Sequence, residues 1–200
     1  MSPAPFHLGW FLNGFRVHGW DTPWIGSTLH HWMEADFYRD FAPADAQREL
    51  FRWHIALALE TKLPLVIHTR AASEEMIATL KETGAGRAGG SLHAFHGDPA
   101  FARAGVDLGF HLGIGGGLTK DPARLRESLR GIPADRLLLE TDAPYLAPPG
   151  AASRRNEPSN VPLIARTLAA ALDLEPDEVS RITDENARRL FRLPGSAEAR

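Results

Sequence analysis

Residues 63–68 of the 200-residue chain read Leu63-Pro64-Leu65-Val66-Ile67-His68, an apolar run that closes on a histidine. A short apolar run without alternating polar residues is typical of a strand buried on both faces, as in a parallel sheet. A helical stretch opened by Pro43 precedes the run, and its apolar side chains share one face: Phe51, Ile55, Ala58 and Leu59. After the run, Ser73 followed by Glu74 and Glu75 is typical of a helix start. This region therefore predicts a helix, a buried strand and a second helix.

The same alternation continues toward the carboxyl terminus. Further strand candidates lie at 91–95, 107–114 and 137–139. Asp98 and Asp121, each followed by proline, are typical helix starts, because proline lacks the backbone hydrogen that would go unpaired there. An amphipathic helix is expected from Val161, and two shorter helices from Pro176 and from Asp184. Buried strands that alternate with amphipathic helices indicate an α/β fold, a parallel sheet covered by helices.

Three of the four strand candidates end in side chains that bind metals, namely His68, His93 and Asp142. The carboxyl ends of parallel strands meet at one edge of a sheet, where catalytic groups gather. Neutral imidazoles and a carboxylate around an open position suit a divalent metal, which lowers the pKa of bound water and polarises a phosphoryl oxygen. A lone histidine at a strand end is more often packed or solvated. Three suitable residues at such ends together favour a metal site.

The overall composition limits the classes of function. The formal net charge is −3, whereas proteins that hold nucleic acid mainly by counterion release are usually basic, so any contact with nucleic acid is expected in a local cleft. The chain has no cysteine, which excludes disulfides and thiolate metal ligands. Neither a signal peptide nor an apolar stretch of membrane-spanning length is present, so a cytoplasmic protein without a membrane partner is expected. The oligomeric state is left open.

Several motifs, in the right order, resemble the TatD family of metal-dependent hydrolases. The longest are the run Pro64-Leu65-Val66-Ile67-His68-Thr69-Arg70 with the residues that follow it, and the segment 128–144 that ends in Glu140-Thr141-Asp142-Ala143-Pro144. Shorter stretches similar to the family lie at 92–95, 154–158 and 185–191. The resemblance extends from about residue 36 to residue 193, and it predicts a TatD-like domain over residues 37–200.

The resemblance implies a (β/α)8 TIM-type barrel of the amidohydrolase kind, present here as a partial barrel that lacks the usual first strands. It implies a divalent metal, zinc, magnesium or manganese, and DNA as the substrate, although some members act on misacylated tRNA. Carried over to this sequence, His68, His93 and Asp142 are metal ligands, and Asp142 is also the catalytic group that handles the proton of the attacking water. Four residues are expected on the phosphate side of the cleft, or else in a salt-bridged loop: Arg70, Arg155, Asn156 and Glu157.

The sequence departs from the family pattern near its amino terminus. The family has a His-x-His pair, which occurs nowhere in this sequence, and a bridging glutamate whose position falls on Trp32. His30 and His31, or His7 and His18, are candidate replacements as ligands. A catalytically inactive TatD remnant is therefore one alternative.

Residues 1–36 resemble a different family and are predicted to be a foreign segment. The stretch His7-Leu8-Gly9-Trp10-Phe11-Leu12-Asn13-Gly14-Phe15 is similar to the start of luciferase-like flavin monooxygenases of the nitrilotriacetate monooxygenase type. A join with the TatD-like part is expected at 36–40, and a flavin-dependent monooxygenase is the runner-up function. Farther along the chain, the glycine-rich stretch 113–117 is either a phosphate cradle or a simple turn after a strand.

Overall fold

The computed structural model describes residues 44–69, 72–96 and 98–193. The predicted foreign segment 1–36 lies outside these ranges, and so do the join at 36–40, the candidate histidines of the amino-terminal part, Trp32 and Arg70. The predictions made for these residues therefore stay predictions.

Four parallel strands form one sheet in the order β1-β2-β3-β4. They are β1 (Leu65–His68), β2 (Gly90–His93), β3 (Phe110–Ile114) and β4 (Leu137–Leu139). His68 pairs with His93 in the register, and Ile114 with Leu139, so the carboxyl ends of the strands meet along one edge. The parallel α/β sheet predicted from the sequence is confirmed. The strand predicted at 107–114 starts only at Phe110, because Asp107 is the last residue of the preceding helix.

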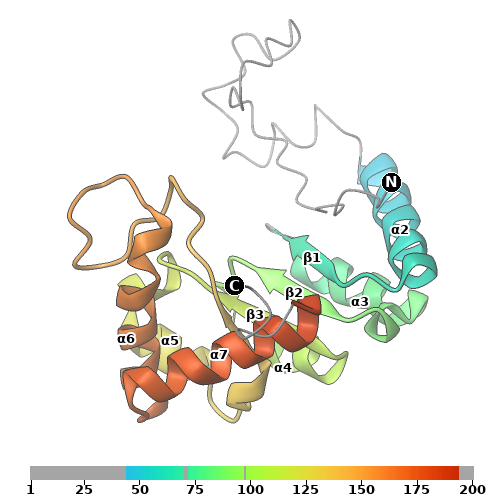
Figure 1. Cartoon of the computed structure of the whole chain (residues 1–200). Helices are drawn as coiled ribbons and strands as arrows, with labels where there is room; N and C mark the ends of the chain where they lie inside the picture. The colour runs from blue at the N-terminus through green and yellow to red at the C-terminus, as the bar shows by residue number, and fades with distance from the viewer. Residues whose placement is uncertain (1–43, 70–71, 97, 194–200) are drawn as a thin grey trace, which may run out of the picture.

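Six α-helices join and cover these strands in the described part of the chain. They are α2 (Ala44–Thr61), α3 (Ser73–Thr83), α4 (Pro99–Asp107), α5 (Pro122–Ser128), α6 (Val161–Leu172) and α7 (Pro176–Phe191). Short 3-10 turns lie at Ala85–Arg87, Leu118–Lys120, Ala134–Arg136 and Pro158–Asn160. In Figure 1, α2 and α3 lie beside β1, and α5 and α6 lie toward the other side of the molecule.

Two aspartates set the starts of α4 and α5, as predicted. The carboxylate of Asp98 accepts a hydrogen bond from the Phe101 amide at 2.7 Å, and that of Asp121 accepts one from the Arg124 amide at 3.0 Å. Each bond pairs a backbone donor that the first helical turn leaves free. A cap of this kind contributes about 1 kcal/mol to stability.

The core lies between the sheet and its helices. Phe110, Leu112 and Ile114 of β3 are completely buried, and they belong to one hydrophobic cluster with side chains from other strands and helices, among them Leu92, Phe101, Leu137, Ile164 and Leu168. A strand buried on both faces needs no polar alternation, which explains the uninterrupted apolar runs in the sequence.

The two short helices predicted from Pro176 and Asp184 are one continuous helix, α7, so that prediction was wrong. Asn186, 1% exposed, lies in the middle of α7 and donates from Nδ2 to the backbone oxygens of Ala134 and Leu137, both at 2.9 Å. This side chain ties α7 to the amino end of β4. The tertiary contact stabilises a helix across a stretch whose local pattern suggested a break.

Candidate active site

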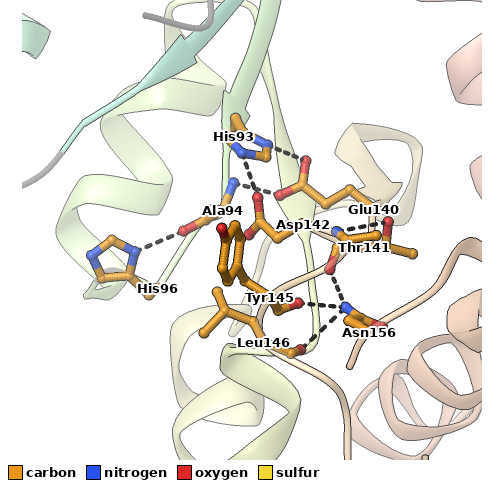
Figure 2. Close-up of polar contacts among 10 residues, drawn as sticks. His93, Ala94, His96, Glu140, Thr141, Asp142, Tyr145, Leu146 and Asn156 are labelled. Carbon is orange, nitrogen blue, oxygen red and sulfur yellow. Dashed lines mark hydrogen bonds and ion pairs between the residues drawn. The ribbon is translucent and has the colours of Figure 1, made fainter. Parts of the chain in front are cut away.

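His93, the last residue of β2, lies between two carboxylates at the carboxyl edge of the sheet. Its Nδ1 atom is 2.9 Å from Oε2 of Glu140, and its Nε2 atom is 2.8 Å from Oδ1 of Asp142. All three side chains are at most 19% exposed. Figure 2 shows the imidazole ring with Glu140 and Asp142 on its two nitrogens. The edge of the sheet therefore gathers one imidazole and two carboxylates in a largely buried group.

Glu140 is the site residue that the sequence analysis did not select. It follows β4 directly, and its second oxygen, Oε1, accepts a hydrogen bond from the backbone amide of Ala94. One carboxylate thus holds both the ring of His93 and the backbone next to it. A carboxylate that accepts from one ring nitrogen fixes the tautomer of a histidine and directs the other nitrogen toward a ligand.

Gly113 on β3 provides the space for that carboxylate. A Cβ atom built on Gly113 would lie 2.3 Å from Oε2 of Glu140, so any other residue would displace the side chain. The glycine at this position, on the strand adjacent to the Leu-Leu-Leu-Glu run, was the available signal for Glu140. Its meaning depends on the register of β3 and β4, where Gly113 pairs with Leu138.

The charges around His93 change its protonation. Burial alone lowers the pKa of His93, but the hydrogen bonds to Asp142 and Glu140 and their negative charges outweigh burial and raise it to about 10. In the metal-free protein the ring is therefore a cation held between two anions. A divalent cation compensates the same carboxylates, so proton and metal compete for this position.

His68, the last residue of β1, is adjacent to this group. Its ring centroid is 5.7 Å from that of His93, and the side chain is exposed. Within the described ranges, the ligand atoms that lie within 4.8 Å of one another belong to His93, Glu140 and Asp142. The structure thus brings two of the three predicted ligands together, adds Glu140, and leaves His68 beside them.

The loop that carries Asp142 packs against the glycine-rich stretch after β3. A Cβ atom on Gly116 would lie 2.0 Å from the backbone oxygen of Leu146, and one on Gly117 would contact the Leu146 side chain at 3.3 Å. Residues 140–148, named here the Asp142 loop, therefore lie close against Gly113–Gly117. The structure has a turn at 116–117, as the turn interpretation predicts, and the phosphate-cradle interpretation stays a prediction.

Two residues of the site have left-handed backbone conformations. Ala94 has φ +50° and Asp142 has φ +56°. Alanine in this region costs roughly 1–2 kcal/mol, and aspartate tolerates it better. The strain is retained where the Glu140 carboxylate binds the Ala94 amide, at the site itself. Such outliers concentrate at functional sites because the surrounding structure must stabilise them.

A pocket of about 490 Å³ is lined in part by Ala143 and Pro144, the two residues that follow Asp142. Its lining consists of Ala143, Pro144, Arg155, Asn156, Glu157, Pro158 and Ser159. Arg155 and Glu157 are exposed there, whereas Asn156 is 1% exposed. Three of the four residues predicted on the phosphate side thus line one pocket next to the candidate catalytic carboxylate. The fourth, Arg70, lies outside the described residues.

The donor set fits a divalent metal. An imidazole nitrogen and a carboxylate oxygen 2.8 Å apart are ligand types shared by zinc, manganese and magnesium-type hydrolase sites. Glu140 supplies the partner that a ligating histidine requires on its other nitrogen. A site formed by His93 and Asp142, with His68 alongside, suits one ion.

The sequence is similar to known hydrolases over most of its length. A family model described as TatD related DNase matches residues 33–192. The uncharacterized metal-dependent hydrolase YabD of Bacillus subtilis is 43% identical over 195 residues, which cover 93% of this chain and 76% of that protein. The 3'-5' ssDNA/RNA exonuclease TatD of a Rahnella species is 41% identical over 79% of this chain and 62% of its own length. Neither relative is a flavin enzyme by name, and the flavin alternative has no support here.

A solved structure shows the same architecture. The crystal structure of YJJV, a TatD homolog from Escherichia coli, superposes with a TM-score of 0.66 at 29% identity, over 76% of this chain and 60% of that one. This likeness and the four-stranded parallel sheet confirm the predicted TIM-type α/β fold. The chain spans about three fifths of the Rahnella exonuclease and of the YJJV structure.

The amino-terminal segment and the location of the protein are not tested by these comparisons. The family model begins at residue 33, but the alignment with YabD covers 93% of the chain and so extends into residues 1–36. None of the helices that the structure describes is long and apolar enough to cross a membrane. The foreign segment and the cytoplasmic location stay predictions. The family assignment rests on the match over residues 33–192: this chain belongs to the TatD related DNase family.

Proposed function

We propose that this protein is a metal-dependent phosphodiesterase that hydrolyses single-stranded DNA. The observation that carries the proposal is the convergence of His93 and Asp142, 2.8 Å apart at the carboxyl edge of the sheet, with Glu140 behind the histidine. The Rahnella relative, named as an exonuclease for single-stranded DNA and RNA, supports this substrate class. An imidazole and carboxylates at one edge of a parallel sheet suit hydrolysis of a phosphate ester.

In this proposal His68, His93 and Asp142 hold a divalent zinc, magnesium or manganese ion. When bound, the ion would lower the pKa of the attacking water and act as a Lewis acid on the phosphoryl oxygen. Asp142 accepts the proton of the attacking water, because its carboxylate lies 2.8 Å from Nε2 of His93, the ring nitrogen that Glu140 leaves for the metal. Glu140 fixes the ring of His93 from behind.

Arg155 and Glu157 form the substrate side of the site. Both are exposed on the pocket that adjoins Asp142, and a guanidinium pairs well with a phosphate oxygen. The formal net charge of −3 means that attraction of DNA must come from such local groups. Arg70 is proposed to contribute to the same side by its position two residues after His68.

The test is cleavage of an end-labelled single-stranded DNA with added magnesium, manganese or zinc. The wild-type protein is compared with Asp142→Asn, which preserves shape but removes the negative charge and the base. We expect cleavage that requires metal and a loss of about 10³-fold or more in Asp142→Asn, as for residues that act as a unit.

Asp135→Asn is the matched control, because it makes the same chemical change at an exposed carboxylate beside the amino end of β4. It should cleave like the wild type. Equal cleavage by wild type and Asp142→Asn would overturn the proposal and point to a contaminating nuclease. No cleavage by any variant with any of the three metals would favour the inactive remnant.

A further inference from the structure

Asn156 is almost completely buried, at 1% exposed, and its amide group is fully occupied. Nδ2 donates to the backbone oxygen of Thr141, to that of Tyr145 at 2.8 Å and to that of Leu146 at 3.3 Å. Figure 2 shows these bonds converging from the Asp142 loop onto one side chain. An asparagine amide has two N–H donors, and both are directed at this loop.

The oxygen of the same side chain points to the other segment of the site. Oδ1 accepts from the Glu157 amide at 2.9 Å and from Nδ2 of Asn160 at 3.0 Å. The backbone amide of Asn156 also donates to the oxygen of Pro144 at 3.0 Å. One residue therefore joins the Asp142 loop to the segment that exposes Arg155 and Glu157 on the pocket.

Asp142 lies between the carbonyls that Asn156 holds. The backbone oxygen of Thr141 precedes it, that of Tyr145 follows it, and the Tyr145 amide donates to the backbone oxygen of Asp142 at 2.7 Å. On another side, the loop packs against Gly116, two residues after the end of β3. A Cβ atom on Gly116 would lie 2.0 Å from the backbone oxygen of Leu146, so only glycine allows this close approach. The glycines permit the position of the loop, and Asn156 supplies the hydrogen bonds that stabilise it.

We propose that Asn156 is a positioning residue that fixes the catalytic carboxylate of Asp142 relative to the pocket lined by Arg155 and Glu157, and that it does not contact the substrate. This inference rests on the proposed function of Asp142 and replaces the expected substrate contact at Asn156. A side chain with 1% exposure and both donors used has no free donor for a phosphate oxygen. Its effect reaches the reaction through the geometry of the loop.

The decisive variant is Asn156→Asp, which preserves size and the acceptor oxygen for Glu157 and Asn160. It replaces the donor group by a carboxylate oxygen that faces the carbonyls of Thr141 and Tyr145, so only the half of the network that holds the Asp142 loop is lost. Asn156→Ala removes both halves. A misplacement of about 1 Å can cost about 10²-fold in rate, so we expect kcat of Asn156→Asp to fall roughly 10–100-fold with KM changed less than about twofold.

Asn186→Ala is the matched control for the loss of a buried asparagine. Asn186 is equally buried and also donates to two backbone carbonyls, but at the amino end of β4. It should lower the melting temperature as Asn156→Ala does, while kcat and KM per folded molecule stay at wild-type values. A drop in kcat common to both asparagines would mean a general structural effect and would overturn the positioning role.

Hydrogen exchange of the Tyr145 amide and the affinity for Mn²⁺ are measured on the same proteins, because neither depends on DNA cleavage. Asn156→Asp should speed exchange at Tyr145 and weaken Mn²⁺ binding, and Asn186→Ala should leave both unchanged. A rise in KM alone, with kcat, exchange and Mn²⁺ affinity unchanged, would show a direct substrate contact and overturn the inference. If wild type fails to cleave DNA, the proposed function fails, while exchange and Mn²⁺ affinity still decide whether Asn156 positions Asp142.

Discussion

The carboxyl and the amino ends of the sheet hold similar residues in opposite electrostatic surroundings. At the carboxyl end, His93 lies between the carboxylates of Glu140 and Asp142, and its pKa is raised to about 10. At the amino end, His111 of β3 is buried near Arg136 and Arg189. Burial lowers its pKa, and the two positive charges lower it further. The same residue type on two adjacent strands is thus stabilised as a cation at one end and as a neutral ring at the other.

This difference favours the carboxyl end as the place for a metal. Carboxylates that stabilise a proton on His93 also favour a divalent cation there, whereas burial and the charges of Arg136 and Arg189 disfavour a positive charge on His111. The two buried asparagines also lie at opposite ends of the sheet. Asn156 holds the Asp142 loop at the carboxyl end, and Asn186 ties α7 to the amino end of β4. Burial and hydrogen bonding alone therefore do not mark a functional residue. The charge of the neighbours distinguishes the two ends.

Among the variants that test the difference between the two ends, Gly113→Ala at the carboxyl end is expected to have the largest effect, a loss of metal affinity. The new Cβ would lie 2.3 Å from Oε2 of Glu140 and displace the carboxylate from His93. Loss of the partner of a ligating histidine typically costs about 10–100-fold in metal affinity, which calorimetric titration with Mn²⁺ measures.

Gly86→Ala makes the same kind of change near the amino end, where a Cβ would lie 2.2 Å from the Leu108 oxygen. We expect it to lower stability by about 1–3 kcal/mol, as overpacking does, with Mn²⁺ affinity unchanged. Equal losses of metal affinity in both variants would contradict the division between the two ends.

The next effect concerns the pocket beside the site. Arg155→Ala should raise KM for single-stranded DNA by roughly tenfold and reduce the salt dependence of binding by about one phosphate contact, because a guanidinium that pairs with phosphate is lost. Arg154→Ala is the control, since Arg154 is exposed next to Arg155 but does not line the pocket. Steady-state kinetics at two salt concentrations compare them. Identical behaviour of the two variants would remove Arg155 from the substrate side.

In the chelator-treated protein, His93 is expected to limit stability at alkaline pH and His111 to limit it at acidic pH. The folded-state pKa of His93 lies above its ordinary 6.5, so its contribution is complete below 6.5 and is lost as pH rises through about 10. His111 has a lowered pKa, so the contribution of its neutral ring is present above 6.5 and is lost as pH falls below that value. Melting temperatures across this range should be highest near neutral pH.

Two variants test which histidine causes the loss of stability on each side of that pH profile. Asp142→Asn should flatten the alkaline side, because one of the charges that raise the pKa of His93 is gone. His111→Asn should flatten the acidic side. An alkaline side that persists unchanged in Asp142→Asn would contradict the coupling of His93 to Asp142.

The smallest effect on activity is expected from Asn186→Ala. Two hydrogen bonds to the carbonyls of Ala134 and Leu137 are lost, and buried acceptors without partners cost about 1–3 kcal/mol. Urea unfolding should show this loss with an unchanged m-value, and cleavage per folded molecule should equal that of the wild type. A loss of activity at full folding would mean that the amino end of β4 also controls the site.

Local sequence patterns predicted much of the fold. The apolar run at 63–67 and its counterparts gave strands, because burial on both faces removes polar alternation, and Asp98 and Asp121 marked helix starts that the structure confirms. The break predicted before Asp184 was wrong, since the bonds of Asn186 to β4 stabilise α7 across it. Helix boundaries of this kind depend on contacts outside the local window.

The sequence by itself determined the parallel α/β architecture and the presence of His93 and Asp142 at strand ends, because strand periodicity and chain order place these residues at one edge of a sheet. Only the tertiary structure decided that Glu140 holds His93 from 47 residues away, that Gly113 leaves room for it, and that Asn156 is buried under the Asp142 loop. Periodicity reports which face of an element is buried. It carries no information on which distant polar groups meet, since that depends on strand register and on the packing of loops against each other.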